Sequence, residues 1–405
     1  MNSKEIFQMA LQLSEPWYVR EIEFKETKTK RLELHIQIEY RKGYVFESDS
    51  KVHDTQERTW RHLNFFEHES YLHCKLPRIK TKEGTVKTVQ VPWARKGSGF
   101  TLLFEAFSMA LIEREMPVNK VANLLGEYAQ RIWNIFNYWI RISYDKDDQS
   151  TVTRIGIDET SVRKGHDYIT VAADLLRRRV IHVTEGKNSE SIGKLKEHLE
   201  SKGVKPIQIT DACIDMSTGF IKGLYKYFPT TAITFDKFHV IKILNEAMDK
   251  IRRNEARDHA MLKGHKYTFL KSNNHLNEKQ KQERAELIEL LPVIGKAYRL
   301  KILFNDFWEF KDKEEAASFL IYWCDLAEED KISELVKFAQ TVKIHFKGIV
   351  NYIESQIANG VMEGINNKIQ LAKRRARGYT NIKNFINMIY FLTGKLNFNY
   401  PQYFT

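Results

Sequence analysis

The stretch Ile155-Gly156-Ile157-Asp158 opens the part of the chain whose order of elements decides the fold. Two further β-rich stretches follow it, YITVAA at 168–173 and RVIHV at 179–183. Each is rich in β-branched residues, and only a few turn residues separate one from the next. The sequence therefore predicts three consecutive strands that pair as an antiparallel meander.

Alternating helical and β-rich stretches continue this pattern. A helical stretch at 191–199 precedes a strand at 206–214, and a helix-like stretch at 217–227 precedes a strand at 231–235. Strand–helix–strand crossovers imply parallel pairing. We therefore expect an α/β sheet that joins an antiparallel meander to parallel strands.

Three acidic residues stand at corresponding places in this order of elements. Asp158 ends the first strand, Asp215 follows the fourth strand, and Glu363 opens a later helix. With the first and fourth strands side by side and the closing helix packed across them, this is the ribonuclease H-like arrangement. Carboxylates brought together in this way repel one another unless divalent cations neutralise them. Two such cations about 4 Å apart could hold the attacking and leaving oxygens of a phosphodiester, which indicates nuclease or strand-transfer chemistry.

Each carboxylate also has a purely structural interpretation. An Asp at a strand end is commonly a turn residue or a helix N-cap, and a Glu in the first turn interacts favourably with the helix dipole. Asp211 competes with Asp215, because it lies four residues earlier in the same stretch and would sit in the middle of the strand. A carboxylate in mid-strand is costly unless it faces solvent or the site. We therefore favour Asp215.

Composition restricts the class of protein. The 405 residues include 64 Lys and Arg against 52 Asp and Glu, which gives a formal charge of +12. This excess favours a polyanionic partner, although basic faces are often only solvated. Cys74, Cys213 and Cys324 contain no C-x-x-C pair, which argues against a disulfide framework and a cysteine zinc site. No apolar run approaches the roughly 20 residues of a membrane helix, so we expect a protein of the reducing cytoplasm with no membrane partner.

Changes in pattern divide the chain into five segments. A charged stretch at 145–148 marks the first boundary. We predict a β-rich module at 1–99 (short-stranded and turn-rich from about 46), a helix–turn–helix domain at 100–148, a first part of the α/β domain at 149–240, a helical insertion at 241–355 and closing helices at 356–405. The predicted fold class is an α/β ribonuclease H-like domain with a large all-helical insertion, preceded by a small β-rich module and a helix–turn–helix.

A succession of motifs resembles the ISL-three family of bacterial insertion-sequence transposases. The motifs are WRHL (60–63), PWAR (92–95), GIDET (156–160), IDMS (214–217), FDKFH (235–239) and NGVMEG (359–364). They follow one another in order and at similar spacing from about residue 50 to the C-terminus, which makes the match specific. The resemblance implies a DDE transposase whose acidic triad falls on Asp158, Asp215 and Glu363. The long interval before Glu363 fits a helical domain inserted there, as in relatives.

The resemblance also implies cofactors, partners and a location. Two Mg²⁺ (or Mn²⁺) ions would be held by the triad. The partner would be DNA, both the terminal inverted repeats of the element and the target. We expect a homodimer or higher oligomer in the DNA complex, in the bacterial cytoplasm and associated with the nucleoid.

The sequence departs from the family near its N-terminus. Members usually carry two cysteine pairs that form a zinc ribbon, and a structural zinc needs four N or S ligands. The corresponding stretches, 46–50 and 80–84, hold no cysteine. His68, His73 and Cys74 could be offered as a substitute, but half-buried histidines of a β module are the simpler interpretation. We therefore expect a degenerate zinc-ribbon-like module without zinc. It is either packed by aromatic residues (Trp60, Phe65, Phe66, Tyr71 and Trp93) or partly impaired.

Residues 117–140 have the spacing of a helix–turn–helix. Ala122 is small enough for a close helix crossing, and Gly126 permits the turn. The second helix of such a motif enters the major groove. The candidate DNA-facing residues are Tyr128, Gln130, Arg131 and Asn134. An ordinary helical hairpin is the alternative.

A basic stretch follows Glu363. Residues 368–377 hold five basic residues and no acid, namely Lys368, Lys373, Arg374, Arg375 and Arg377. Phosphate contacts beside a metal site would position a DNA backbone. We therefore predict DNA contacts for this stretch, although a solvated helix face would look the same.

Two further pairs of residues could support the site. Asp236 and His239 stand three residues apart where a strand runs into a helix, so they could bind metal or handle protons. Asp236 is also a natural N-cap. Asn359 and Gly360 form the turn that precedes Glu363.

The function that we predict is DNA transposition. The enzyme would bind the ends of its element, cut them with water, and join the freed 3′-hydroxyl to target DNA by metal-dependent transesterification. Two alternatives stay open: a catalytically silent DNA-binding regulator derived from a transposase, and a metal-dependent nuclease that cuts without joining.

Overall fold

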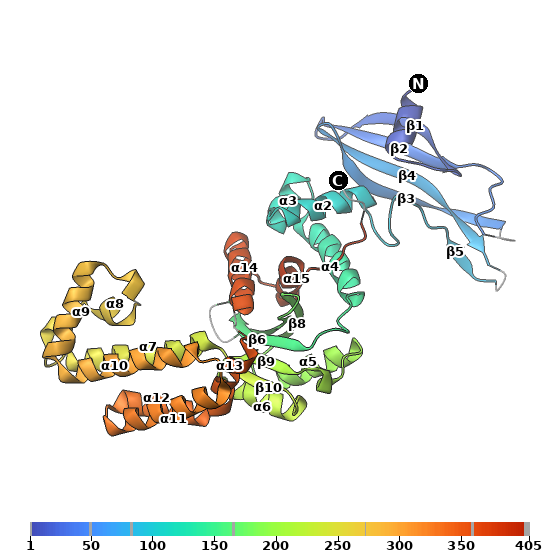
Figure 1. Cartoon of the computed structure of the whole chain (residues 1–405). Helices are drawn as coiled ribbons and strands as arrows, with labels where there is room; N and C mark the ends of the chain where they lie inside the picture. Colours follow the sequence, from blue (N-terminus) through green and yellow to red (C-terminus); the bar gives the residue numbers. More distant parts are fainter. Residues whose placement is uncertain are drawn as a thin grey trace. The chain divides into compact units, whose positions relative to one another are not determined.

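The computed structural model describes residues 2–47, 51–81, 84–163, 167–271, 273–357 and 360–400. The chain forms two compact units, Met1–Ser143 with Asn397–Thr405, and Tyr144–Leu396. Figure 1 labels most elements of both units. Within the part of the chain that the structure describes, no helix combines the length and the apolar character that a membrane span requires.

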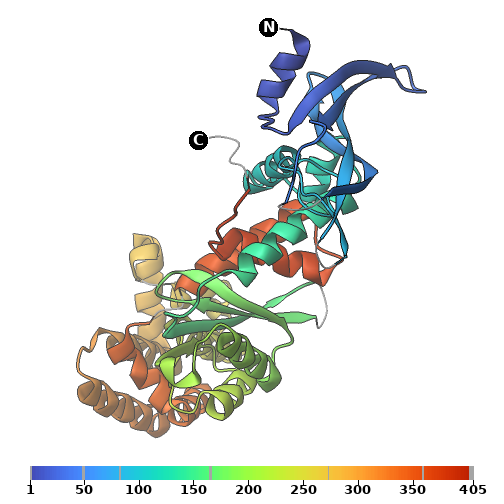
Figure 2. The same ribbon diagram turned by 90° about the vertical axis from the view of Figure 1, so that its right-hand side faces the viewer.

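A five-stranded sheet opens the first unit, in the order β1–β2–β4–β3 with β5 paired to β4. Strands β1 and β2, and strands β3 and β4, pair antiparallel, whereas β2 and β4 run parallel. The elements are α1 (Ser3–Ala10), β1 (Trp17–Glu26), β2 (Leu32–Tyr40), β3 (Lys51–Phe65), β4 (His68–Lys80) and β5 (Val86–Thr88). Figure 2 shows α1 beside this sheet.

The long β3–β4 hairpin corrects the expectation of short strands after residue 46. Most of β3 is exposed on both faces, so its sequence carries no alternation of apolar and polar residues from which a strand could be inferred. The core lies on one face of the sheet, where Trp93 packs edge to face against Trp17 and Trp60 with ring centroids 5.1 and 5.7 Å away. Of the aromatic residues expected to pack the module, Phe66 is instead largely exposed.

Three helices complete the first unit. They are α2 (Leu102–Glu113), α3 (Val118–Leu124) and α4 (Ala129–Asp145), the last of which ends at the border of the second unit. Gly126 has a φ of +69° between α3 and α4, a conformation that favours glycine. Ala122, the small residue expected at a close helix crossing, is buried, and so is Ile132 of α4.

A mixed sheet forms the centre of the second unit, in the order β10–β9–β6–β7–β8. The meander β6–β7–β8 is antiparallel, and β9 runs parallel to both β6 and β10. The elements are β6 (Arg154–Ser161), β7 (Tyr168–Asp174), β8 (Arg179–Glu185), α5 (Ser189–Ser201), β9 (Asp211–Ile214), α6 (Thr218–Tyr227) and β10 (Ala232–Phe235). The predicted pairing of the first and fourth strands is confirmed.

One strand begins later than predicted. Residues Pro206–Gln208 form a 3₁₀ helix, and β9 starts only at Asp211. Pro206 lacks the backbone N–H that a strand ladder requires, and its fixed φ suits the first position of a helical turn.

Helices fill the chain after β10, as predicted. They are α7 (Lys237–Glu255), α8 (Lys266–Leu270), α9 (Glu278–Leu290), α10 (Pro292–Asp306), α11 (Lys313–Glu329), α12 (Ser333–Ile344) and α13 (Phe346–Ser355). Their buried side chains are continuous with the core of the sheet. The chain then returns to the sheet through α14 (Gly360–Ala376) and α15 (Ile382–Thr393), where Tyr390 Oη accepts a hydrogen bond from the backbone N–H of Val183 in β8 at 2.8 Å.

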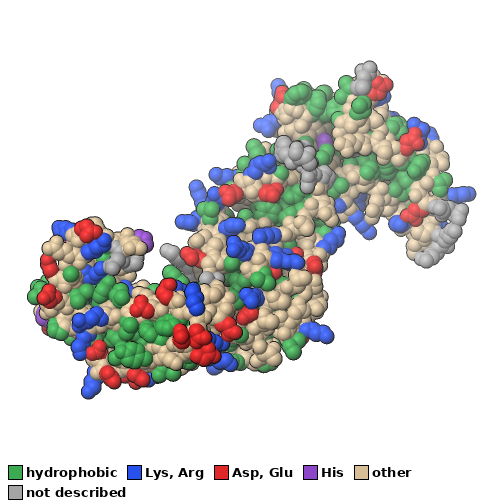
Figure 3. Space-filling view, viewed as in Figure 1, with side chains coloured by type: hydrophobic (Ala, Val, Ile, Leu, Met, Phe, Trp, Pro, Cys, Tyr) green, Lys and Arg blue, Asp and Glu red, His purple; other side chains and the backbone are tan. Residues whose placement is uncertain are grey.

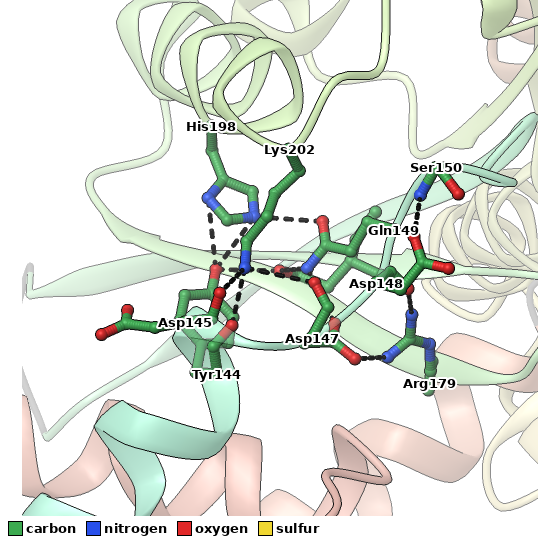
Figure 4. Close-up of polar contacts among 10 residues, drawn as sticks. Tyr144, Asp145, Asp147, Asp148, Gln149, Ser150, Arg179, His198 and Lys202 are labelled. Atoms are coloured by element: carbon green, nitrogen blue, oxygen red, sulfur yellow. Dashed lines mark hydrogen bonds and ion pairs between the residues drawn. The ribbon is translucent and has the colours of Figure 1, made fainter.

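A polar cluster fixes the start of the second unit (Figure 4). Lys202 Nζ donates to the carbonyl oxygens of Tyr144, Asp145 and Asp147 at 2.7, 2.9 and 3.2 Å. The carbonyls of Tyr144 and Asp145 end α4, so the ammonium group supplies the donors and the positive charge that a helix C-terminus lacks. Arg179 pairs with the Asp147 carboxylate at 2.5 Å.

Two histidines complete this cluster. The rings of His182 and His198 stack with centroids 4.5 Å apart, and His198 Nε2 contacts Gln149 Oε1 at 3.0 Å. Burial lowers the pKa of His182 to about 3 and that of His198 to about 4. Both rings are therefore neutral in the folded protein at neutral pH.

We expect the protein to lose stability between about pH 6.5 and pH 4. A histidine in the unfolded chain titrates near pH 6.5. Between pH 6.5 and pH 4 the unfolded chain therefore binds a proton at His198 that the folded protein does not bind. The free energy of unfolding decreases as the pH is lowered through this window. Urea denaturation at pH 7.5 and pH 5.0 measures the loss, on the order of 1–2 kcal/mol per histidine. His198→Gln should weaken this dependence, whereas His259→Gln, at an exposed position, should not. An unchanged acid dependence in His198→Gln would contradict the expectation.

Candidate active site

Three aspartates stand in a row at one edge of the second sheet. The register pairs Gly156 of β6 with Cys213 of β9, and Ile214 of β9 with Phe235 of β10. Extending the β6–β9 register by two residues sets Asp158 opposite Asp215. Extending the β9–β10 register by one residue sets Asp215 opposite Asp236. The carboxyl ends of parallel strands meet at the same edge of a sheet, so this edge carries three neighbouring carboxylates.

Asp158 is the most constrained of the three. It lies within β6, which continues to Ser161, so the expectation that it ends the strand was wrong. Its Oδ1 accepts a hydrogen bond from the backbone N–H of Glu159 at 2.8 Å, and its Oδ2 accepts one from Asn366 Nδ2 at 2.7 Å. Burial raises the pKa of Asp158, and the charge of Asp215 raises it further, while these hydrogen bonds act in the opposite direction. A carboxylate in such surroundings is stabilised by a nearby cation.

Asp215 and its competitor Asp211 lie at opposite ends of β9. Asp215 follows the strand, and its Oδ1 accepts a hydrogen bond from the backbone N–H of Ser217 at 3.0 Å. Asp211 is the first residue of β9 and pairs with Arg154 at 3.3 Å. The expectation that Asp211 would sit in mid-strand was wrong, because the strand starts after the 3₁₀ helix. Its position at the amino end favours Asp215 as the member of the row.

Asp236 combines a structural and an electrostatic role. It is the N-cap of α7, where its side chain accepts a hydrogen bond from the backbone N–H of Phe238, and only 4% of its surface is exposed. Its Oδ2 also lies 2.8 Å from His239 Nδ1. This hydrogen bond raises the pKa of His239, and the charges of Asp158 and Asp215 add to the effect, although burial opposes it. His239 therefore lies within the field of all three aspartates.

Helix α14 lies along β6 and supplies further polar groups. Besides the contact of Asn366 with Asp158, Gln370 Nε2 donates to Thr160 Oγ1 at 3.0 Å and Lys373 Nζ donates to the carbonyl oxygen of Ser161 at 2.6 Å. Gly156 permits this close packing, since a Cβ atom there would lie 3.0 Å from Met362 Cγ. Sequence reasoning missed Asn366 and Gln370. The signal that could have identified them is their helical spacing, which places them on one face of α14.

Glu363 begins the same face of α14. It lies one turn before Asn366, but its side chain is exposed. In the ranges that the structure describes, no group of three or more Asp, Glu, His or Cys side chains is close enough to hold a metal ion. The sheet register makes Asp158, Asp215 and Asp236 neighbours, and His239 is hydrogen-bonded to Asp236, but among the described residues neither these side chains nor Glu363 close into such a group. Gly360 is the first residue of α14, and Asn359 lies outside the described residues.

The donor set suits a hard cation. Carboxylate and amide oxygens are the ligands that Mg²⁺ and Ca²⁺ prefer. Beside Asp158, the buried Asn366 Oδ1 has no hydrogen-bond partner among the described residues. An unsatisfied acceptor next to the Asp158 carboxylate is a position at which a cation, or water bound to it, would be stabilised.

The candidate residues of the helix–turn–helix differ in how they are held. Gln130 Nε2 donates to Asn134 Oδ1 at 2.9 Å, and both side chains are exposed at the start of α4. Tyr128, just before this helix, is also exposed. Arg131 Nη1, by contrast, pairs with Glu127 at 2.6 Å, and its guanidinium group lies over the ring of Phe100. Arg131 is therefore tied to the body of its own unit.

A buried arginine supports the same turn from the first sheet. Arg61 Nε lies 3.6 Å from Glu69 and 3.9 Å from Glu127. A Cβ atom on Gly126 would lie 3.1 Å from the Glu69 carboxylate. The β3–β4 hairpin thus contacts the turn between α3 and α4, which sequence reasoning did not foresee.

The basic stretch is only partly open to solvent. Lys373 contacts Ser161 in β6, whereas Lys368, Arg374, Arg375 and Arg377 are exposed. Basic residues in the last turn of α14 also interact favourably with the helix dipole. Figure 3 shows that Lys and Arg side chains are spread over the surface, with Asp and Glu among them.

The residues weighed as a substitute zinc site do not converge. His73 and Cys74 are consecutive in β4 and point to opposite faces of the sheet. Cys74 lies in the core, where burial raises its pKa to about 12, and His73 Nε2 contacts His35 Nδ1 at 2.8 Å. Of the stretches that correspond to the family's cysteine pairs, residues 48–50 and 82–83 lie outside the described residues.

Comparison with known proteins gives concordant matches. The model of the DDE domain of family ISL3, described as a transposase, matches residues 155–389, and the helix–turn–helix domain of transposase family ISL3 matches residues 89–140. The transposase for insertion sequence element IS1001 of Bordetella parapertussis is 26% identical over 339 residues, which cover 81% of this chain and 82% of the relative. The transposase for insertion sequence element IS1557 of Mycobacterium tuberculosis is 26% identical over 357 residues, covering 80% and 78%.

Proposed function

Because the chain belongs to the ISL3 family of insertion-sequence transposases, we propose that its row of aspartates is the centre at which DNA is cut and joined. The chain is a DDE transposase of a bacterial insertion sequence, and it binds DNA. Enzymes of this family use divalent metal ions. In the proposal, Asp158, Asp215 and Glu363 hold two Mg²⁺ or Mn²⁺ ions.

The adjacency of Asp158 and Asp215 carries this proposal. Asp158 is half-buried beside a second carboxylate, and its pKa is raised by both effects. The unsatisfied Asn366 Oδ1 lies next to it. Glu363 joins the row in the proposal because it shares the face of α14 on which Asn366 contacts Asp158. The matched DDE model spans all of these residues.

Each protein group has a distinct task in this proposal. Bound divalent ions would supply charge neutralisation for the attacked phosphate and activation of water or of a 3′-hydroxyl. Asn366 holds the Asp158 carboxylate in place through its amide group. The Asp236–His239 pair places a group with a raised pKa beside the row, where it can keep or give up a proton.

We propose the ribonuclease H-like fold for the second unit. The meander β6–β7–β8, the parallel strands β9 and β10, and the return of α14 along β6 support it. The predicted division into a module (1–99), a helix–turn–helix domain (100–148), an α/β domain (149–240 and 356–405) and a helical insertion (241–355) belongs to the same proposal. A homodimer or higher oligomer on DNA is part of it as well.

End cleavage followed by joining tests the proposed function. Purified protein is incubated with a labelled duplex of the element end, a target duplex and Mg²⁺. We expect 3′-hydroxyl ends and joined products. Binding without cleavage would favour a catalytically silent regulator, and cleavage without joining would favour a nuclease.

Substitutions in the helix–turn–helix and in the basic stretch should impair DNA binding in different ways. Gln130→Ala with Asn134→Ala should lower the preference for element ends over random DNA, at a cost of about 1–3 kcal/mol for each base-reading hydrogen-bond pair that the substitution removes. Arg374→Ala with Arg375→Ala should instead weaken binding to every DNA and flatten its salt dependence, because phosphate contacts are not sequence-specific. Competition binding at several salt concentrations separates the two effects.

Arg131→Ala provides the comparison within the motif. Arg131 pairs with Glu127, so its loss should lower the melting temperature of the protein more than the loss of Gln130 and Asn134. If the Gln130/Asn134 variant keeps its full preference for the ends, these residues do not read bases.

A further inference from the structure

We propose that the groove between α7 and α8 receives one unpaired base of the bound DNA, stacked on the ring of Phe238. This inference rests on the proposed function of the neighbouring aspartate row. The groove has a volume of about 250 Å³, and its wall includes Phe238, Ile241, Asn245 and Leu270.

Phe238 joins the groove to the aspartate row. It lies in the first turn of α7, between Asp236 and His239, and its ring centroid is 5.9 Å from that of His239. Although Asp236 is nearly buried, 65% of Phe238 is exposed. A strand held at the row therefore passes close to an uncovered aromatic ring. Every base offers a π-face that can stack on such a ring, and this makes stacking independent of sequence.

The groove also offers a hydrogen-bond acceptor. Phe238, Ile241 and Asn245 stand at positions i, i+3 and i+7 of α7, so they line one face of the helix. Asn245 Oδ1 is buried and has no hydrogen-bond partner among the described residues. The amino groups of adenine, cytosine and guanine are donors that would satisfy it. An unsatisfied buried acceptor beside an exposed ring fits a base better than it fits an apolar side chain.

Charge around the groove is compatible with a nucleotide. Lys242 and Lys266 lie at its wall and are exposed, where they can approach a phosphate. Of the two acidic residues at the wall, Asp249 is already paired with Arg252 at 2.8 Å and with Arg253 at 3.3 Å, and Glu246 is exposed. A base that leaves the duplex loses its stacking and its pairing partner. In the groove, Phe238 can replace the lost stacking, and Asn245 can replace part of the lost base pairing.

A comparison of intact and abasic DNA tests the proposal. Full-length parent and Phe238→Ala are titrated with element-end duplexes in Ca²⁺, each duplex lacking one base near the cleavage site. On intact ends, Phe238→Ala should bind about tenfold more weakly, as expected from the loss of one stacked base. At one position, removal of the base should abolish this difference, because no base is left to stack. Phe238→Tyr should behave like the parent on every duplex.

Two further variants sharpen the result. Tyr322→Ala removes a comparably exposed aromatic ring from α11 and should not change binding. Asn245→Ala should reduce the preference among bases at the position found with Phe238→Ala and leave the affinity for the abasic end unchanged.

Two results would contradict the proposal that a base stacks on Phe238. A difference between parent and Phe238→Ala that persists on every abasic duplex would overturn the proposal. If Phe238→Ala instead dissociates an oligomer of the free protein and no position restores equal binding, the ring covers a second copy of the chain and the proposal fails. Because binding is measured in Ca²⁺, this result is distinct from a failure of end cleavage by the parent in Mg²⁺.

Discussion

Asp158→Asn and Asp215→Asn are each expected to reduce cleavage of element-end DNA to below about one thousandth of the parent rate. Each substitution replaces a proposed metal ligand by a neutral group of nearly the same size. Asp158 is half-buried and already has a raised pKa, so the neutral amide should be tolerated by the fold. End binding and the melting temperature should therefore change little. The measurement is a time course of end cleavage in Mg²⁺, with binding followed in Ca²⁺. Glu363→Gln should give the same loss.

Asp211→Asn is the matched control for this series. It stands at the amino end of β9 and pairs with Arg154, away from the row of aspartates. We expect its cleavage rate to stay close to that of the parent. A dead Asp211→Asn together with an active Asp215→Asn would show that the second ligand has been assigned to the wrong carboxylate.

Asn366→Ala is expected to lower the cleavage rate or the affinity for Mg²⁺ by about 10-fold to 100-fold. The substitution removes the 2.7 Å hydrogen bond that holds Asp158 Oδ2. Because the carboxylate itself remains, a higher Mg²⁺ concentration should restore part of the activity. The Mg²⁺ dependence of the cleavage rate measures both effects and separates this positioning role from a merely structural one.

Asn367→Ala serves as the control for that variant. Asn367 is the next residue of α14 but is exposed to solvent. It should cleave like the parent at every Mg²⁺ concentration. An unchanged Mg²⁺ dependence of Asn366→Ala would show that Asn366 does not position the Asp158 carboxylate for metal binding.

Local patterns made much of the fold predictable. The meander and the two crossovers depend on short β-rich and helical stretches with clear periods, and their order fixes which strands are neighbours. The row of Asp158, Asp215 and Asp236 follows from the same order, because each residue comes one or two residues after the last parallel pair of its strand. The exposed strand β3 carried no such period, and its length could not be inferred.

Contacts between distant segments could not be predicted. The hydrogen bond of Asn366 with Asp158 joins residues on α14 and β6 that only the packed structure brings together. Likewise, the contact of Arg61 in β3 with Glu127, the partner of Arg131, joins segments that are far apart in the sequence. The candidates that the helix–turn–helix pattern offered are all exposed, but the pattern did not show that Arg131 is already paired with Glu127.

Binding of Mn²⁺ measures directly whether the aspartate row holds metal ions. The full-length protein bound to element-end DNA is titrated with Mn²⁺, and free Mn²⁺ is followed by electron paramagnetic resonance. We expect the parent to bind about two ions per active site. Asp158→Asn and Glu363→Gln should each lose tight binding, while Asp211→Asn should keep it. Parent-like Mn²⁺ binding by Asp158→Asn would contradict the assignment of the aspartate row as the metal site.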